Sequence, residues 1–184
     1  MLIKIKNFFV IIIFLFPAII FSLTDSSIYN LKIDLLDHRN KTKDISDLSG
    51  KVQIFSMIYT NCKTVCPIIV SNMKNIEKLL SKYYLDNIEF TLVSLDPERD
   101  DVESLNRFFI EKKLNNKNWF IYKTSKDNTL KLALLTGIKF KKEQNDYVHS
   151  NLIIILDKYG SIKFYHQGLN KDFNEVLKII KSLV

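Results

Sequence analysis

The chain has 184 residues, of which 47% are hydrophobic and 26% are charged, and its formal net charge is +7. This length and this apolar content support one folded domain with a sizeable core and exclude a disordered protein. The lysines are spread along the chain rather than clustered with aromatic residues, which argues against a protein that binds nucleic acid.

The first 24 residues have the order of a secretory signal. Lys4 and Lys6 precede an uninterrupted apolar run of 14 residues, 8–21, and small polar residues follow. This run is short for a transmembrane helix, so residues 1–24 are expected to be a signal peptide or, if uncleaved, an N-terminal membrane anchor. The lysines predict export of residues 25–184. Residues 1–24 contain no arginine, which disfavours a mitochondrial transit peptide. We therefore expect a bacterial protein, in the periplasm or at the periplasmic face of the inner membrane.

The first part of the exported chain predicts two strands separated by a polar segment. Residues 28–36 alternate well enough for an edge strand, and residues 37–50 predict a turn and a loop. His38 lies in that polar segment, and we expect a solvated side chain rather than a metal ligand. Residues 52–59 are apolar, β-branched and aromatic, which is typical of a central strand covered on both faces.

Both cysteines of the chain, Cys62 and Cys66, follow this strand. Pro67 fits the first turn of a helix, and a core face at helical spacing continues up to Tyr84, formed by Ile68, Ile69, Met73, Ile76, Leu79 and Leu80. Cys66 is therefore expected at the helix N-terminus, where unpaired N–H groups and the helix dipole lower the pKa of a thiol. We expect Met57, in the strand, and Met73, in the helix, to pack in the core rather than bind metal.

A Cys-x-x-x-Cys pair at a strand-to-helix junction is compatible with three kinds of site. It can form a structural disulfide, or it can cycle as a redox dithiol, although thioredoxin-like proteins have two intervening residues. Its thiolates can also bind a soft metal such as Cu(I). An unprotected pair closes to a disulfide in an oxidising compartment, so a metal-binding pair there needs a thiol reductant. The pair alone does not distinguish these sites.

The next apolar segment, residues 88–95, predicts a strand parallel to the first, in a β-α-β unit. The sequence DPERD follows it. Asp100 can cap the next helix, with Glu103 as its capping-box partner. Because this segment leaves the carboxyl end of a strand beside the cysteine strand, Asp96 and Arg99 are expected to line the same crevice.

The middle of the chain predicts two helices and a projecting loop. Residues 102–112 and 127–135 have helical spacing, and a short strand is expected between them at residues 119–124. Residues 139–147 are polar and mixed in charge, which indicates a projecting loop or hairpin.

The C-terminal segment predicts a β-hairpin, residues 152–156 and 161–165, and an amphipathic helix over residues 171–184. In a thioredoxin-like arrangement, the residue entering this hairpin faces the cysteine loop and is a cis-proline, which is thought to keep metal away from the sulfurs. His149 stands at that entrance here, which favours a three-coordinate site of two cysteines and one histidine. His166 lacks this placement and is expected to be structural or exposed.

The order of these motifs resembles the Sco/SenC family of copper-binding proteins that help to assemble cytochrome c oxidase. A strand precedes Cys-x-x-x-Cys-Pro, a second strand ends in SLDPERD, and His149 precedes an LIIILDKYGSI hairpin. The resemblance covers residues 28–184. It implies that residues 25–184 form an α/β domain, a thioredoxin-like three-layer sandwich with a central mixed β-sheet flanked by helices. It also implies that Cys62, Cys66 and His149 bind Cu(I) or Cu(II).

For the function, the resemblance implies delivery of copper to the binuclear copper centre of cytochrome c oxidase subunit II, or reduction of that subunit's cysteines. The family commonly has Cys-Pro-Asp-x-Cys-Pro, whereas Lys63 and Thr64 occupy the Pro and Asp positions here. Lys63, beside the thiols, favours their ionised form. Thr64, in place of the usual Asp, removes a carboxylate from the surroundings of the two cysteines. We therefore expect a copper metallochaperone for subunit II or another copper protein. The alternative is an exported thiol-disulfide oxidoreductase acting on cysteines of subunit II or other periplasmic proteins.

A peroxidase of the peroxiredoxin kind is disfavoured. Such a site has a threonine three residues before its reactive cysteine, whereas Tyr59 and Lys63 occupy those positions here.

Overall fold

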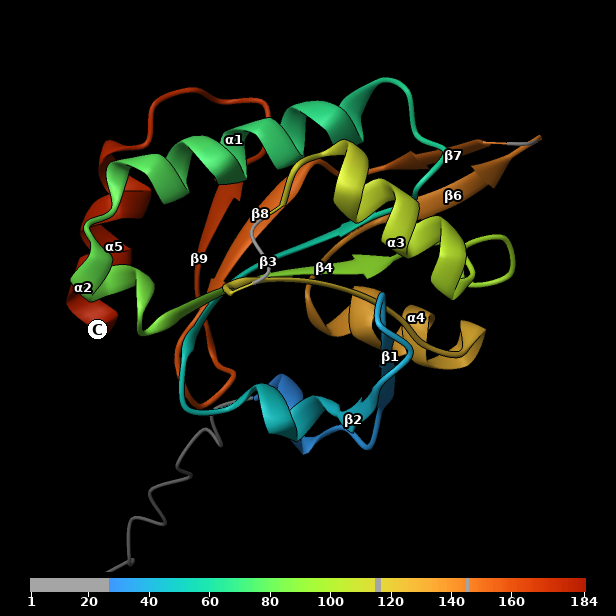
Figure 1. Cartoon of the computed structure of the whole chain (residues 1–184), viewed down its shortest axis with the longest axis horizontal. Coiled ribbons are helices and arrows are strands. Elements are labelled where there is room, and N and C mark those ends of the chain that lie inside the picture. The colour runs from blue at the N-terminus through green and yellow to red at the C-terminus, as the bar shows by residue number, and fades with distance from the viewer. Residues whose placement is uncertain (1–26, 115–116, 145) are drawn as a thin grey trace, which may run out of the picture.

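The structure is a computed structural model that describes residues 27–114, 117–144 and 146–184 (Figure 1). The signal peptide or membrane anchor expected at residues 1–24 lies outside the described residues. Within the described ranges, none of the helices combines the length and the apolar character needed to span a membrane.

A seven-stranded mixed sheet, in the order β2-β1-β5-β4-β3-β8-β9, forms the centre of the domain (Figure 1). Its three central strands are parallel: β3 (Val52–Ile58), β4 (Ile88–Ser94) and β5 (Trp119–Lys123). The outer strands are antiparallel to their neighbours: β1 (Asp34–Asp37), β2 (Thr42–Asp44), β8 (Leu152–Leu156) and β9 (Ile162–Gln167). Every residue of β3 is buried, as its apolar sequence predicts for a strand covered on both faces.

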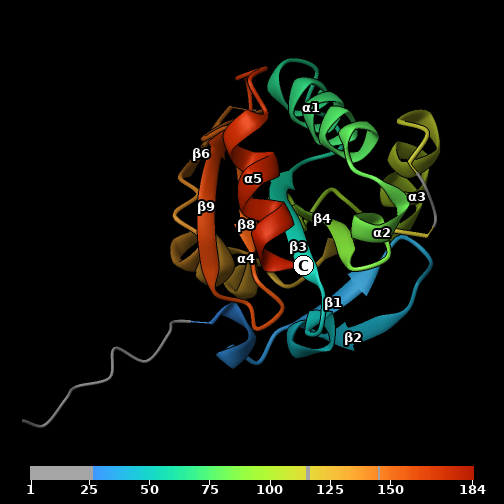
Figure 2. The same cartoon turned by 90° about the vertical axis from the view of Figure 1, so that its left-hand side faces the viewer.

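Helices and loops cover both faces of this sheet. On one face lie α1 (Val65–Leu79), α2 (Lys82–Leu85), α3 (Val102–Glu111) and α5 (Asn174–Leu183). On the other face lie α4 (Lys126–Leu135) and two short 3-10 helices, η1 (Ile28–Asn30) and η2 (Ile45–Leu48). Figure 1 shows α1 and α3 above the sheet and α4 below it, and Figure 2 looks onto α5, which packs against β9. The predicted α/β three-layer sandwich with a central mixed sheet is confirmed.

A second, two-stranded sheet projects from this body. It consists of β6 (Phe140–Glu143) and β7 (Asp146–His149), so the predicted projecting segment forms a hairpin. In the part of the chain that the structure describes, neither strand pairs with the seven-stranded sheet. The position of this hairpin against the body therefore depends on its side chains and on its connections to α4 and β8.

The N-terminal segment differs from the predicted edge strand over residues 28–36. The chain first forms η1, and β1 lies inside the sheet while β2 takes the edge position. The side chain of Ser27 accepts a hydrogen bond from the N–H of Tyr29, 3.1 Å away. This serine cap favours a helical turn over an extended chain at the start of the segment.

His38 is not solvated, and the prediction for this residue is wrong. It is 3% exposed, and its ring stacks on Phe109 with the centroids 4.0 Å apart. Among the described residues, neither ring nitrogen has a hydrogen-bond partner. Burial, and next the charge of Arg39, lower the pKa of His38. The polar neighbours of His38 in sequence did not reveal this environment because α3, which supplies Phe109, lies far along the chain.

The other helices and strands occur in the predicted order, with shifts at helix ends. α1 ends at Leu79, and Ile68 and Leu79 are exposed rather than packed in the core. α5 begins at Asn174 rather than at residue 171. The carboxylate of Asp172 accepts a hydrogen bond from the N–H of Asn174, a local turn that competes with an earlier helix start.

Candidate metal centre

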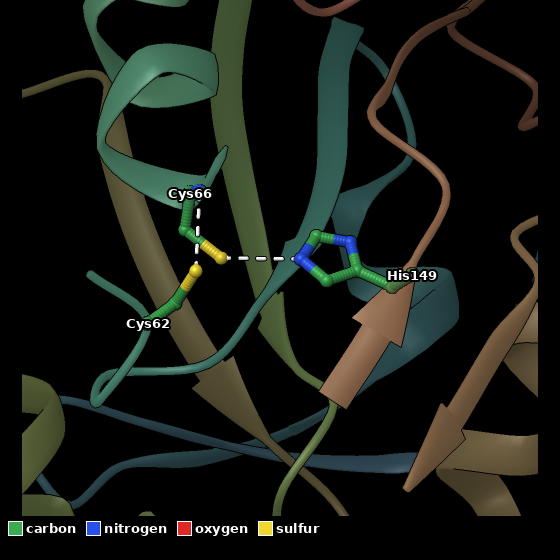
Figure 3. A group of neighbouring side chains, drawn as sticks. All are labelled: Cys62, Cys66 and His149. Atoms are coloured by element: carbon green, nitrogen blue, oxygen red, sulfur yellow. Dashed lines mark hydrogen bonds between the residues drawn. The ribbon is translucent and has the colours of Figure 1, made fainter. Parts of the chain in front are cut away.

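The two cysteines lie where predicted, between β3 and the first turn of α1. The helix begins at Val65, so Cys66 is its second residue and Pro67 its third, where the missing N–H of proline costs no helical hydrogen bond. The side chain of Thr64 does not cap this helix. Instead, the N–H of Cys66 donates to Sγ of Cys62, 3.3 Å away (Figure 3). The helix N-terminus thus stabilises a thiolate at Cys62.

The imidazole of His149 faces the same two sulfurs from the opposite side of the site (Figure 3). His149 is the last residue of β7, and its Nε2 lies 3.3 Å from Sγ of Cys66. Its Nδ1 lies 2.9 Å from the carbonyl oxygen of Ser150. A carbonyl oxygen only accepts, so Nδ1 carries a proton, and in the neutral imidazole Nε2 presents a lone pair to Sγ of Cys66. A metal-binding histidine is commonly oriented in this way.

Together, Cys62, Cys66 and His149 have the donor set and the spacing of a metal site. Their three ligand atoms lie within 4.8 Å of one another, and no other such group occurs within the described ranges. With metal–sulfur bonds of about 2.3 Å and metal–nitrogen bonds of about 2.0 Å, the donors of a trigonal site lie about 4 Å apart. Nε2 of His149 lies 3.3 Å from Sγ of Cys66 and no two of the three atoms are more than 4.8 Å apart, so one ion can reach all three atoms after small side-chain movements. Two soft sulfurs and an imidazole suit copper.

The two thiols differ in their electrostatic environment. The side chain of Cys66, and then its backbone N–H, stabilise the charged form of Cys62 and lower its pKa. The pKa of Cys66, expected to be lowered by the helix N-terminus, is instead raised, first by the hydrogen bond to Cys62 and then by burial. The lowered pKa of Cys62 and the raised pKa of Cys66 make Cys62 the thiol that ionises first.

A groove of about 480 Å³ opens on Cys62 and His149 but not on Cys66. The cysteine loop and the β6–β7 hairpin form its other walls: Thr64, Val65, Glu143, Gln144, Asp146, Tyr147 and Val148. The hydroxyl of Thr64 lies 4.0 Å from Sγ of Cys62, so this position offers a hydrogen-bonding group although it lacks a carboxylate. Cys62 is 6% exposed and borders the groove, whereas Cys66 is fully buried and does not.

Asp100 has a different role from the predicted helix cap. Asp101 caps α3 by accepting a hydrogen bond from the N–H of Ser104, 2.8 Å away. Asp100 is 1% exposed and accepts hydrogen bonds from the N–H and hydroxyl of Thr60, at 3.1 and 2.5 Å, and from the hydroxyl of Ser94, at 2.6 Å. It therefore ties the start of the cysteine loop to the end of β4.

Asp96 and Arg99 were predicted to line the crevice beside the cysteines. They lie near the site, but neither residue lines the groove. They pair with each other and contact Tyr147, which does line it. No pattern in the sequence pointed to Tyr147, Tyr59 or Asp146. A tyrosine at the end of an apolar strand has no pattern that separates it from a core aromatic residue, and its partner Asp146 lies 87 residues away.

The remaining candidate ligands are structural. His166 was expected to be either structural or exposed. It is 4% exposed, and its Nε2 lies 3.1 Å from the carbonyl oxygen of Asn170, so its role is structural. Met57 and Met73 are fully buried in the core, as predicted.

Alkylation of the metal-free protein is expected to reach Cys62 first. At about pH 6, below the usual pKa of a thiol, iodoacetamide should modify Cys62 and leave Cys66 free, because Cys62 is ionised and faces the groove. Cys66→Ala removes the thiol that stabilises this anion, so it should raise the pKa of Cys62 and slow its alkylation. Cys66→Ser, which keeps a hydroxyl donor, should remain fast. Peptide mass spectrometry against time and pH measures both rates, and earlier modification of Cys66 would contradict the assignment.

Comparison with known proteins gives a consistent result. The family model described as SCO1/SenC matches residues 23–184. The SCO1 protein homolog of Bacillus subtilis is 28% identical over 147 residues, which are 77% of this chain and 76% of that protein. The structure of a SCO1/SenC family lipoprotein from Bacillus anthracis is 25% identical, with a TM-score of 0.75 over 83% of this chain and 94% of that chain.

A further match shows the fold alone. The structure of ScoI from Bradyrhizobium japonicum with copper bound has a TM-score of 0.69 at 20% identity, over 83% of this chain and 97% of that chain. These matches confirm the predicted thioredoxin-like α/β fold.

Proposed function

Because this chain belongs to the SCO1/SenC family, we propose that it is a copper metallochaperone that holds its cargo with Cys62, Cys66 and His149. One observation carries this proposal: the three ligand atoms, from two segments far apart in sequence, lie within 4.8 Å of one another beside an open groove. Copper is bound in the B. japonicum protein, which has the same fold.

The chemistry of the three residues fits this cargo. Two thiolates hold Cu(I) well, and an imidazole completes a trigonal set that also tolerates Cu(II) when another ligand is added. The Nε2 lone pair of His149 needs no deprotonation, whereas Cys66 must lose its proton when the metal binds. A ligand from a recipient protein can enter through the groove beside Cys62. The site can therefore both hold copper and give it up.

The proposed setting is the periplasm or the periplasmic face of the inner membrane. Residues 1–24 would export residues 25–184 as a signal peptide, or hold them at the membrane as an anchor. The B. anthracis relative is a lipoprotein, which supports a position outside the cytoplasm and near a membrane. The proposed recipient is subunit II of cytochrome c oxidase, or another copper protein of that compartment, and a thiol reductant keeps the cysteines open.

The different environments of the two thiols favour a second candidate, a thiol-disulfide oxidoreductase. The thiolate of Cys62 would attack a disulfide of the partner, form a mixed disulfide and release one partner thiolate. Cys66, after losing its proton, would attack Sγ of Cys62 and release the second partner thiolate. The partner gains two electrons, and the Cys62–Cys66 disulfide is returned to two thiols by an external thiol reductant.

His149→Ala separates the two functions. Copper binding to the reduced protein, measured by competition for Cu(I) with a chromogenic chelator, should give one copper per chain for the wild type. His149→Ala should weaken binding about 100-fold or more, because even a lost supporting contact costs about 10- to 100-fold in metal affinity. Reduction of a disulfide substrate should largely persist in this variant. Wild-type affinity in His149→Ala, or a wild type that binds no copper, would exclude the carrier and favour the oxidoreductase.

A further inference from the structure

His149 reaches the site from a hairpin that has no backbone pairing with the main sheet among the described strands. The two cysteines, in contrast, follow a fully buried strand and begin a helix of the main body. The 3.3 Å separation between Nε2 of His149 and Sγ of Cys66 is therefore set by whatever holds the hairpin against the body. Side chains of two body segments make the contacts.

The first contact comes from Tyr59, at the end of β3 and three residues before Cys62. Tyr59 is 2% exposed, and its hydroxyl donates to the carboxylate of Asp146 on β7. Its ring lies 5.4 Å from that of Tyr147 and meets the imidazole of His149 edge-on, with the centroids 5.9 Å apart. A hydrogen bond to a carboxylate is stronger than one between neutral groups. The cysteine loop and the histidine strand are thus joined through one side chain.

The second contact comes from the loop after β4. The hydroxyl of Tyr147 donates to Oδ1 of Asp96, 3.3 Å away. Asp96 is 1% exposed and pairs with Arg99, whose guanidinium lies 5.7 Å from the centre of the Tyr147 ring. The N–H of Asp96 also donates to the hydroxyl of Ser94, 3.0 Å away. Tyr147 is therefore held by a carboxylate that is itself fixed to the body.

We propose that Tyr59 and Tyr147 are positioning residues that hold the β6–β7 hairpin so that His149 stays within reach of both thiols. These two hydroxyl contacts favour one position of the hairpin on the body. When they are removed, the hairpin spends time away from the cysteines. The apparent affinity of the three-ligand site then falls in proportion to the fraction of molecules in which His149 is in place. The same contacts give a recipient a means of release, because displacing the hairpin withdraws one ligand from the copper.

The first of two tests measures copper affinity and therefore rests on the proposed function. Tyr59→Phe and Tyr147→Phe remove the hydroxyls and keep the rings. Each should lower the affinity of the reduced full-length protein for Cu(I) about tenfold, the effect of losing a supporting hydrogen bond. Tyr83→Phe is the matched control, since Tyr83 lies on α2 and is 66% exposed. It should bind copper as the wild type does.

A double-mutant cycle tests whether the effect passes through the histidine. In the His149→Ala background, Tyr59→Phe should change copper affinity less than about twofold, because there is no imidazole left to position. An equal loss in both backgrounds would mean that Tyr59 acts on the cysteines directly, which would overturn the proposal.

The second test needs no copper. In the reduced, metal-free protein, amide hydrogen exchange in β6 and β7 should become about tenfold faster in Tyr59→Phe and Tyr147→Phe, while exchange in β3 and β4 stays unchanged. Unchanged exchange in the hairpin would overturn the proposal. If the wild type binds no copper, the proposed function fails, and this measurement alone decides whether the two tyrosines hold the hairpin.

Discussion

Cys66→Ser is expected to lower the affinity for Cu(I) about 1,000-fold or more, since loss of a ligand exceeds the roughly 10- to 100-fold cost of a lost supporting contact. In the proposed site Cys66 contacts both other ligands: its Sγ lies 3.3 Å from Nε2 of His149, and its backbone N–H donates to Sγ of Cys62. A serine hydroxyl stays protonated and is a hard donor, so it fits the space without replacing a thiolate. Chelator competition with the reduced protein measures the loss.

The matched control is Met73→Leu. Met73 lies on the same helix and carries a soft sulfur, but it is fully buried in the core. Its replacement should leave the affinity for copper unchanged, because volume and apolar character are kept. Copper binding by Cys66→Ser within about tenfold of the wild type would show that two ligands suffice and that the site differs from the one proposed.

Asp100→Ala is expected to lower the free energy of unfolding by about 3–4 kcal/mol. The substitution leaves two donors of Thr60 and the hydroxyl of Ser94 without their acceptor in a buried place. Each buried donor that loses its partner costs about 1–3 kcal/mol, and partial access of water to a smaller side chain reduces the sum. Urea denaturation of the metal-free protein measures this loss without any contribution from copper binding.

Two variants serve as controls for Asp100→Ala. Asp101→Ala removes the exposed cap of α3 and should cost about 1 kcal/mol, the usual value for a helix N-cap. Asp100→Asn keeps one acceptor oxygen and should fall between the wild type and Asp100→Ala. A loss for Asp100→Ala no larger than that for Asp101→Ala would contradict the role of Asp100 as a buried tie.

The pH dependence of stability gives a further check on Asp100. Burial, the first cause, raises the pKa of this carboxyl in the folded state above its ordinary value of 3.8. The folded state therefore holds the proton more tightly than the unfolded state. The stability that this adds is fully present below the ordinary pKa and is lost as the pH rises through the folded pKa. Asp100→Asn should remove this part of the pH dependence.

The order of the main helices and strands, and the place of the cysteines, could be predicted from the sequence. Apolar periodicity and the position of Pro67 are local signals, and they were enough to set β3 beside α1 and Cys66 in its first turn. His149 required more than periodicity. It was identified from the place where a thioredoxin-like chain has a cis-proline, and the structure brings its Nε2 to 3.3 Å from Sγ of Cys66.

Two features of the site and one of the core depended on tertiary structure. Asp100 and Asp101 are adjacent acids with equal capping potential, and only the approach of Thr60 selected one for the interior and left the other as the cap. His38 is buried because α3 packs over it. Tyr59 meets Asp146 across 87 residues of sequence.

The sequence by itself therefore determined that Cys62 and Cys66 lie at a strand-to-helix junction, because spacing and side-chain chemistry are properties of short segments. The tertiary structure decided which polar partners meet and how the histidine hairpin is held against the cysteine loop. Hydrogen-bond partners from distant segments are selected by the direction in which packed elements approach one another, and no local pattern records that direction.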